Sequence, residues 1–314
     1  MRIQVPLSNH RTKERVLSDL ALLLTALIWG GGFVAQRQAA PFLGFFTFNG
    51  IRFLLAGLVM LPFVLKNVRR IERRFLWIIP AGVILFAASA LQQAGLETTS
   101  AANGGFLTSV YVVLVPLFMA LVWKRPNPVI NWIAAVAAVA GSYLLSTGGQ
   151  HLTPSSGDLL VLAGSILWAL HVIVVGFAVN KLDPFVFSVG QFLLAGLLHI
   201  AAGWVTGTLA FAGLSFSWVA VLYAGLFSIG IGFTLQAVGQ KKAPASDAAL
   251  ILSLESVFAA VGGYLILAEN LAPIQVLGAA VIFISISTGQ IVQLMRKPAE
   301  TVAVEQQVPG DPLS

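Results

Sequence analysis

The sequence contains no cysteine. This absence excludes disulfides, cysteine-bound zinc, cysteine-bound iron–sulfur clusters and thiol nucleophiles. Charge is also scarce: Asp, Glu, Lys and Arg make up 10% of the 314 residues, whereas roughly 25% is usual in soluble domains. Apolar residues make up 58%. So few charges cannot cover the surface of a water-soluble protein of this length, and the composition therefore predicts an integral membrane protein surrounded by the lipid bilayer.

Long apolar runs account for most of the chain. A helix needs about 20 apolar residues to cross a bilayer, and ten segments meet this requirement. They cover residues 20–40, 45–65, 75–95, 102–123, 129–147, 158–179, 185–206, 217–238, 245–268 and 273–293. Strands of a membrane barrel would be about half as long and would alternate with a period of two. The predicted fold class is therefore all-α, with ten transmembrane helices.

The basic residues are distributed unevenly between the loops. Sixteen of the 18 lysines and arginines lie in the N-terminal segment, in alternate loops or after the last span, and the other five loops contain none. Arg37 and Arg52 lie inside spans. The positive-inside rule then predicts that both termini are cytoplasmic in a multi-pass protein of the cytoplasmic (inner) membrane. Because the net charge of +6 resides in these short loops, it does not indicate a nucleic-acid partner.

The chain contains an internal repeat. Residues 19–58 match residues 158–197 at a constant offset of 139, and the run FLLAGL occurs in both copies. Beyond the second span the offset becomes 144, which pairs Gly95 with Gly239. Each copy contains five spans, and an odd number of crossings places the copies in opposite orientations. Sequence-similar halves of inverted topology are typical of transporters that bind solute near the bilayer midplane.

The repeat divides the chain into four expected parts. They are a basic cytoplasmic tail (1–18), a first five-helix repeat (19–147), a second five-helix repeat (158–293) and a polar cytoplasmic tail (294–314).

A few residues within the spans are costly to place in a membrane. A carboxylate such as Glu255 near the midplane costs about 2.5–3.5 kcal/mol on insertion scales, so it should face the bundle interior. It could carry a proton, pair with a substrate amine or pair with a protein cation. Arg52 could reach outward to the interface or bind an anion inside the bundle. Trp29 and Trp168 are repeat mates in mid-span, suited either to packing or to lining a site.

The candidate substrate-binding set combines these groups with other polar residues inside spans. It comprises Trp29, Arg52, Gln92, Tyr111, Trp168, His171, Gln191, Gln236 and Glu255. For the glutamines, interhelical hydrogen bonding is the alternative role. His171 has no neighbouring metal ligands in the sequence, so no metal site is expected. Motifs of metalloproteases, P-loop proteins and serine hydrolases are absent, so we expect no catalytic residues, no cofactor and no enzyme activity.

Several segments resemble the drug/metabolite transporter superfamily, specifically its EamA-type ten-helix members. They are LLLTALIWGGGFVAQRQA, FFTFNGIRFLLAGLVMLP, TSAANGGFLTSVYVVLVPLFMALVWKRP, GDLLVLAGSILWALHVIVVGFA and ASDAALILSLESVFAAVGGYLILAENLAPIQVLGAAVIF. The resemblance covers about residues 19–293 and implies export or exchange of a small metabolite through a central cavity. Many members have proline after the glutamate of the ninth helix. Ser256 stands there in this chain, so the resemblance does not carry a proline kink to this position.

These observations favour a secondary transporter that exchanges or exports a small, amino-acid-like solute by alternating access. Glu255 is the candidate for proton coupling, with exchange against a counter-solute as the alternative. A flippase for a lipid-like substrate and a membrane sensor or enzyme without flux remain open. The sequence does not indicate an oligomeric state.

The charge pattern makes a direct prediction about topology. Green fluorescent protein fused to either end should fluoresce in a bacterial host, because both ends should lie in the cytoplasm. Alkaline phosphatase should become active only when it is inserted in the five loops without lysine or arginine. Chain ends on opposite sides of the membrane would contradict the inverted five-plus-five arrangement.

Overall fold

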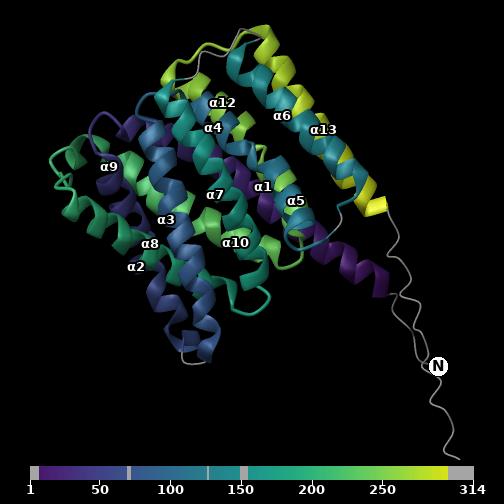
Figure 1. Ribbon diagram of the computed structural model, residues 1–314, viewed down its shortest axis with the longest axis horizontal. Helices are drawn as coiled ribbons and strands as arrows, with labels where there is room; N and C mark the ends of the chain where they lie inside the picture. Colours follow the sequence, from purple (N-terminus) through teal and green to yellow (C-terminus); the bar gives the residue numbers. More distant parts are fainter. Residues whose placement is uncertain (1–6, 69–71, 126, 149–154, 296–314) are drawn as a thin grey trace, which may run out of the picture.

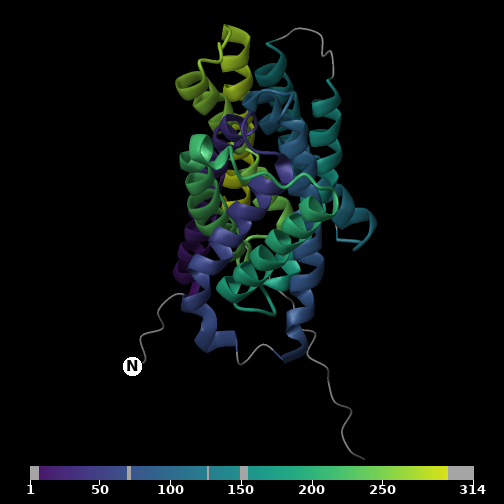
Figure 2. The ribbon, with the colours of Figure 1, turned by 90° about the vertical axis from the view of Figure 1, so that its left-hand side faces the viewer.

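The structure is a computed structural model that describes residues 7–68, 72–125, 127–148 and 155–295 (Figure 1). These residues form helices and connecting turns without any strand. Ten helical segments are long and apolar enough to cross a membrane, which confirms the predicted fold class. Figure 2 shows that most helices run along a common direction, as expected for a bundle that spans a bilayer.

The spans are built from thirteen α-helices and two other helical segments. In chain order these are α1 (Leu7–Ala39), α2 (Phe45–Val68), the 3-10 helix η1 (Glu72–Trp77), α3 (Ile78–Gly95), α4 (Ala101–Ser109), α5 (Tyr111–Leu121), α6 (Val129–Thr147), α7 (Ser156–Ala178), α8 (Pro184–Val205), α9 (Leu214–Leu222), the π-helix η2 (Tyr223–Phe233), α10 (Thr234–Gln240), α11 (Ala245–Leu252), α12 (Glu255–Leu267) and α13 (Pro273–Met295). Helix α1 begins at Leu7, so residues 7–18 of the expected tail are helical.

Short polar signals in the sequence explain where several helices begin. Ser155 and Asp158 form a capping box at the start of α7, with each side chain accepting a hydrogen bond from the other's backbone N–H. The side chain of Asp183 caps α8 and is followed by Pro184 at the first helical position. These caps satisfy backbone N–H groups that a helix leaves without internal partners.

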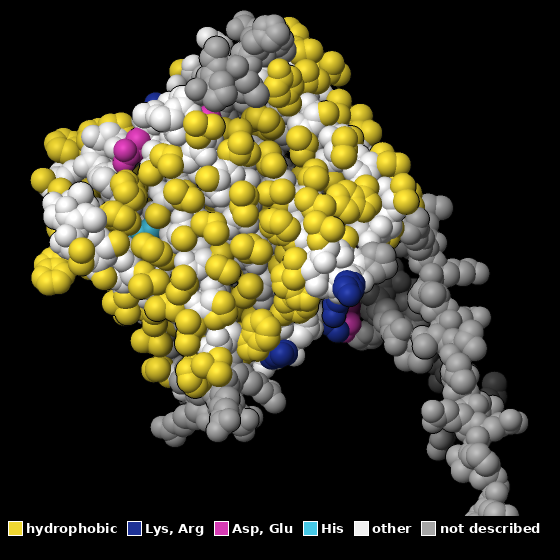
Figure 3. All heavy atoms as spheres, in the orientation of Figure 1, with side chains coloured by type: hydrophobic (Ala, Val, Ile, Leu, Met, Phe, Trp, Pro, Cys, Tyr) yellow, Lys and Arg dark blue, Asp and Glu magenta, His cyan; other side chains and the backbone are white. Residues whose placement is uncertain are grey.

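The face of the bundle seen in Figure 3 is largely apolar. Large side chains project outward along the spans; Phe63, for example, is 80% exposed and Trp204 is 77% exposed. Only 22% of the α13 window is buried within the protein. A water-soluble bundle would bury such side chains, whereas lipid tails solvate them at no cost.

The contacts between α2 and α8 show that the two halves are inverted. A Cβ placed on Gly57 would lie 2.6 Å from the side chain of Leu193, and one on Gly196 would lie 2.8 Å from that of Leu54. Gly57 and Gly196 are repeat mates, and so are Leu54 and Leu193. Exchanging the halves therefore turns one contact into the other, as a two-fold axis requires. The helices run antiparallel, which is the arrangement that the odd span count predicts.

A second pair of contacts repeats the same symmetry elsewhere in the bundle. A Cβ on Gly95 of α3 would lie 2.5 Å from the Val161 side chain of α7. The mates of these residues, Gly239 of α10 and Leu22 of α1, are also in contact, since a Cβ on Gly239 would lie 2.8 Å from the Leu22 side chain. Mated helices α6 and α13 also pack along their length (Figure 1). The pseudo-two-fold axis thus relates the two whole halves.

The fourth and ninth spans are interrupted at equivalent positions. Helix α4 ends at Ser109 and α5 starts at Tyr111, while α11 ends just before Ser253 and α12 starts at Glu255. The hydroxyl of Ser109 donates to the carbonyl three residues earlier, and its mate Ser253 does the same, each at 2.8 Å. Hydroxyl groups that compete for helix carbonyls loosen a helix in this way. Ser165 within α7 and Ser285 within α13 make the same bond in unbroken helices, so the bond alone does not cause the break. The ninth span is nevertheless interrupted beside Glu255 without a proline.

Loops expected on the outer side gather at one end of the bundle. Arg37 of α1 donates to the carbonyls of Leu96 and Glu97, both at 3.1 Å. The backbone N–H of Ala101 donates to Glu269, which follows α12. These contacts join the ends of α1, α3 and α12 to the start of α4.

The basic loops gather at the other end, which we call the basic end. Arg125, Lys181, Lys241 and Lys242 line one pocket there. Arg15 of α1 donates to Gln290 of α13 at 3.3 Å, so the first and last helices reach the same end. The number of spans is therefore even, as the charge pattern predicts.

Close glycine contacts should be essential for packing. In Gly278→Ala, the new methyl group would lie 2.5 Å from the carbonyl oxygen of Gly141. Because backbone cannot move aside cheaply, we expect a loss of about 1–3 kcal/mol in stability. Thermal unfolding in detergent, followed by tryptophan fluorescence, measures this loss. Gly164→Ala is the matched control, because its methyl group would meet the nearest atom at 3.5 Å; equal melting temperatures for the two variants would contradict the prediction.

Candidate functional site

A central cavity lies between the two halves. Seven of the nine residues predicted from the sequence line it, and they come from seven different spans. These residues are Trp29, Arg52, Gln92, Tyr111, Trp168, Gln236 and Glu255. The cavity has a volume of about 30 Å³, roughly the room needed by one water molecule. A solute can therefore enter this cavity only if the surrounding side chains move apart.

Glu255 lies at the first residue of α12, directly after the break in the ninth span. Its side chain is 3% exposed, and its Oε1 has no hydrogen-bond partner among the described residues. The start of a helix carries a partial positive charge, which stabilises a carboxylate. The helix break thus supports a negative charge at a depth where an unsupported one would be costly.

Arg52 supplies the opposite charge. It is 2% exposed, and its guanidinium carbon lies 5.0 Å from the ring centre of Phe48 and 5.3 Å from that of Phe53. Its Nε has no hydrogen-bond partner, and none of the ion pairs formed by the described residues includes Arg52. Contacts with aromatic faces compensate a buried cation only partly. The side chain therefore has the capacity to bind an anion in the cavity.

Tyr111 and Glu255 occupy equivalent places in the two halves. They are repeat mates at the offset of 144, and each starts the second segment of a broken span. Both line the cavity, and the hydroxyl of Tyr111 lies near the carboxylate of Glu255 without making a hydrogen bond of ordinary geometry among the described residues. The pseudo-symmetry thus brings a phenol and a carboxylate to the same centre, where each can bind a polar group of a ligand.

The mates Gln92 and Gln236 show how the halves differ. Gln92 donates to Gln36 at 3.0 Å and accepts from Thr108 at 3.3 Å. In the second half the positions equivalent to Gln36 and Thr108 hold apolar residues, Val175 and Leu252. Both amide atoms of Gln236 are consequently without partners among the described residues. A buried amide in this state favours a ligand that can donate and accept hydrogen bonds.

Aromatic rings form another part of the wall. The ring centre of Phe233 lies 4.5 Å from that of Trp29 and 5.9 Å from that of Trp168. The indole N–H of Trp29 donates to the carbonyl of Ser228 at 3.1 Å, within the π-helix η2. The indole N–H of Trp168 has no partner among the described residues. The two mid-span tryptophans therefore come together around one ring, although only one of them is tied to the backbone.

His171 and Gln191 lie behind this wall and do not line the cavity. His171 Nε2 donates to Gln191 Oε1 at 2.9 Å, and both residues are fully buried. The imidazole meets the Trp168 ring edge-on, with 5.8 Å between ring centres. In this conformation the pair supports Trp168. Among the described residues no group of three His, Asp or Glu side chains is arranged to hold a metal ion.

Eight further residues line the cavity that the sequence pattern did not indicate. They are Phe33, Gln36, Phe53, Thr108, Val172, Ser228, Ile229 and Phe233. Helical spacing would have found several of them, because Phe33 and Gln36 lie four and seven positions after Trp29 on the same face. No such spacing finds Ser228 and Ile229, since the π-helix changes the angular step between successive residues.

Comparison with known proteins gives consistent similarities. A sequence profile of the EamA-like transporter family matches residues 16–147 and 155–288. An uncharacterized transporter of Archaeoglobus fulgidus is 31% identical over 278 residues, which cover 87% of this chain and 85% of that protein. The inner membrane transporter YedA of Escherichia coli K12 is 28% identical, with 66% of this chain and 69% of that protein covered.

More distant similarities extend over similar lengths. The chloroplastic WAT1-related protein At3g02690 of Arabidopsis thaliana is 24% identical, with 84% of this chain and 67% of that protein covered. One crystal structure superimposes with a TM-score of 0.71 at 18% identity and covers 89% of this chain and 99% of its own. At this identity the superposition shows a shared fold.

The unpaired state of Arg52 predicts an unusual stability effect. Arg52→Met should raise the melting temperature of the ligand-free protein by the equivalent of about 1–3 kcal/mol, because it removes a buried charge that the aromatic rings compensate only partly. Tryptophan fluorescence during heating measures the change. Arg37→Met serves as the matched control and should lower stability, since it removes two hydrogen bonds to carbonyls. A similar loss of stability in both variants would show that Arg52 has a compensating partner.

Proposed function

Because this chain belongs to the EamA-like transporter family, we propose that it is a secondary transporter which moves a small, amino-acid-like solute across the cytoplasmic membrane by alternating access. One observation carries the proposal. Arg52 and Glu255 are both buried inside the protein, and their side chains, which are of opposite charge, line the same cavity. No ion pair of the described residues includes either of them.

A zwitterion matches these two charges. Its carboxylate would bind the guanidinium of Arg52, and its ammonium group would bind Glu255 with help from Tyr111. The apolar part of the solute would pack on the rings of Trp29 and Trp168. Each buried charge is costly alone, so a ligand that satisfies both has an affinity that a neutral apolar solute lacks.

Alternating access is supported by the symmetry of the halves. Each half contributes one broken span, and both breaks adjoin the cavity at Tyr111 and Glu255. Helix breaks are natural places for a bundle to bend, because backbone bonds there span three residues in place of the usual four, as from Val113 to Val110 and from Val257 to Leu254. Rocking of one half against the other would open the cavity first to one side and then to the other.

Glu255 is the proposed coupling residue. A carboxylate that binds the solute ammonium in one step can bind a proton in the return step, which would couple the two fluxes. Exchange against a counter-solute needs no such protonation. The two mechanisms differ in their response to an imposed pH gradient.

A lipid-like substrate is the second candidate. An apolar groove of about 500 Å³ lies between α2, α8, η2 and α10, and Met60, Phe63 and Phe185 are among the residues that line it. The π-helix η2 contributes residues to both the groove and the cavity. A flippase could pass an acyl chain along this groove, whereas a sensor or enzyme without flux has no specific support in the site.

Proteoliposomes test the proposal. After a thermal-shift screen of amino acids has identified a ligand, the wild-type protein should accumulate it when a pH gradient is imposed. Glu255→Gln should abolish this dependence, because an amide cannot carry the proton. Glu269→Gln is the matched control, since Glu269 binds the backbone of Ala101 at one end of the bundle.

Two results would count against the proposal. Full pH-gradient dependence in Glu255→Gln would show that Glu255 does not couple the proton flux. If no amino acid shifts the melting temperature or moves across the membrane, while a lipid analogue does, the solute class is wrong and the flippase becomes the better candidate.

A further inference from the structure

A second, larger pocket opens at the basic end of the bundle. It has a volume of about 790 Å³ and lies between the ends of α5, α7 and α10 and the starts of α6 and α11. We call it the basic-end pocket. Its polar lining includes Arg125, Asn131, Lys181, Gln240, Lys242 and Asp247. It is large enough for an amino acid, whereas the central cavity in this structure is not.

Positive charge dominates the rim of this pocket. Arg125 lies 5.6 Å above the ring of Phe177, and Lys181 lies 4.4 Å above the ring of Trp77. Lys241 and Lys242 lie beside them in the α10–α11 turn. A concave surface with several cations in a low-dielectric wall attracts anions.

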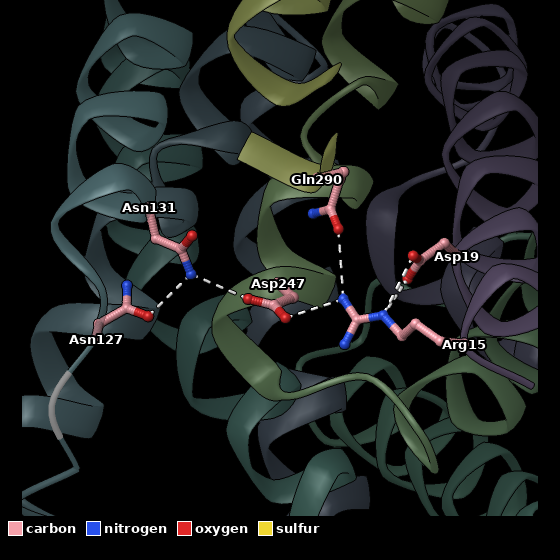
Figure 4. Close-up of polar contacts among 6 residues, drawn as sticks. All are labelled: Arg15, Asp19, Asn127, Asn131, Asp247 and Gln290. Atoms are coloured by element: carbon pink, nitrogen blue, oxygen red, sulfur yellow. Dashed lines mark hydrogen bonds and ion pairs between the residues drawn. The ribbon is translucent and has the colours of Figure 1, made fainter. Parts of the chain in front are cut away.

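The carboxylate in the pocket wall is already engaged. Asp247 accepts from Arg15 at 2.9 Å and from Asn131 at 3.0 Å, and Figure 4 shows it held between them. Arg15 also bonds Asp19 and Gln290 (Figure 4). This network joins α1, α6, α11 and α13. On the rim, Lys242 also forms an ion pair with Glu14 at 2.9 Å.

Gln240 is the one buried amide at the inner side of the pocket that has an unsatisfied acceptor among the described residues. The side chain is 2% exposed, and its Nε2 donates to the carbonyl of Val172 at 2.8 Å. Its Oε1 has no hydrogen-bond partner in the described part of the chain. Leaving a buried acceptor unpaired costs about 1–3 kcal/mol. A ligand with an N–H donor would remove that cost.

The basic-end pocket and the central cavity are stacked along the same two helices. Gln236 lines the cavity and Gln240 lines the pocket, and the two are four residues apart on one helix. Val172 and Gly176 have the same relationship on α7. Four residues correspond to about one helical turn, or roughly 5–6 Å. A solute in the pocket is therefore one turn away from the central site.

Two residues that line the pocket have repeat mates of a different kind. The repeat mate of Gln240 is Leu96, and that of Asp247 is Asn103. The orphan acceptor and the engaged carboxylate are thus features of one half, and the pseudo-symmetry does not account for them.

We propose that the basic-end pocket is a second binding site for the transported zwitterion. The carboxylate binds among Arg125, Lys181 and Lys241, and the ammonium group donates to Oε1 of Gln240. The solute waits here before it moves one turn inward to the central cavity. This inference rests on the proposed function, and it adds a site on the side that the charge pattern assigns to the cytoplasm.

Because the chain contains no cysteine, a single introduced cysteine reports on the pocket without background. Gly176→Cys is suitable, since a Cβ there would meet its nearest neighbour at 3.4 Å. A thiol reagent with a sulfonate group should label it about tenfold faster than one with a trimethylammonium group. Ser215→Cys, exposed at the opposite end, is the control and should show no such preference.

Leucine is the test solute, with two analogues that each lack one charge. Leucine at ten times its dissociation constant should slow labelling of Gly176→Cys about tenfold, because the free site falls by the factor 1 + [L]/Kd. In the Gly176→Cys protein, Gln240→Met should weaken protection by leucine and by 3-methylbutylamine, which keeps only the ammonium group. It should not weaken protection by 4-methylpentanoate, which keeps only the carboxylate. Adding Lys241→Gln should weaken protection by leucine and 4-methylpentanoate but not by the amine. Melting curves identify any variant that fails to fold.

A central double variant, Arg52→Met with Glu255→Gln, separates the two sites. Leucine should still protect Gly176→Cys in this background, although transport is lost. If protection disappears with the central charges, the effect spreads from the central cavity, and the second site is wrong while the proposed function stands. If wild-type protein moves no amino acid but protection persists, the proposed function fails and the pocket remains an amino-acid site.

The remaining outcome concerns the membrane itself. The phosphate group of an anionic lipid would also suit a basic pocket. Nanodiscs of phosphatidylglycerol and of phosphatidylcholine distinguish this source. If phosphatidylglycerol slows labelling and leucine does not, the pocket holds a lipid headgroup and the proposal is overturned.

Discussion

The antiparallel packing of α2 against α8 is the constraint on which the rest of the structure depends. Mated glycines, Gly57 and Gly196, let the mated leucines of the opposite helix approach closely. In lipid, such close approach replaces the hydrophobic effect as the main source of helix association. Once these helices cross about a two-fold axis, every other element of one half has an inverted partner, and both helix breaks converge on one cavity.

The two halves differ chemically where they meet at the central cavity. Tyr111 has a carboxylate as its mate, and the satisfied amide of Gln92 has the unsatisfied amide of Gln236 as its mate. Arg52 is the mate of Gln191, so only one half contributes a cation to the cavity. A perfectly symmetric site would present the same groups from both halves. These differences instead give the two sides of the cavity different charges and different hydrogen-bonding groups.

Much of the candidate site could be read from the sequence, because the cost of burying a polar group is independent of the exact fold. Glu255 had to face the interior, and the repeat identified Trp29 and Trp168 as mates in mid-span, whereas for Arg52 the sequence left both the interface and the bundle interior open. The positions of His171 and Gln191 could not be read in this way. Sequence spacing cannot distinguish a helix position that faces the cavity from a neighbouring position that faces another helix. Only the tertiary packing shows that His171 and Gln191 lie against Trp168 and not in the cavity wall.

The sequence alone determined the ten spans, their all-helical form and the inverted halves, since apolar length, the placement of basic residues and an odd repeat leave few other arrangements in a bilayer. Only the tertiary structure decided that the ninth span breaks at Glu255 without proline, that η2 is a π-helix, and that the basic-end pocket is open while the central cavity is contracted. These features depend on side-chain hydrogen bonds and contacts between residues far apart in the chain, and no local pattern of residues encodes them.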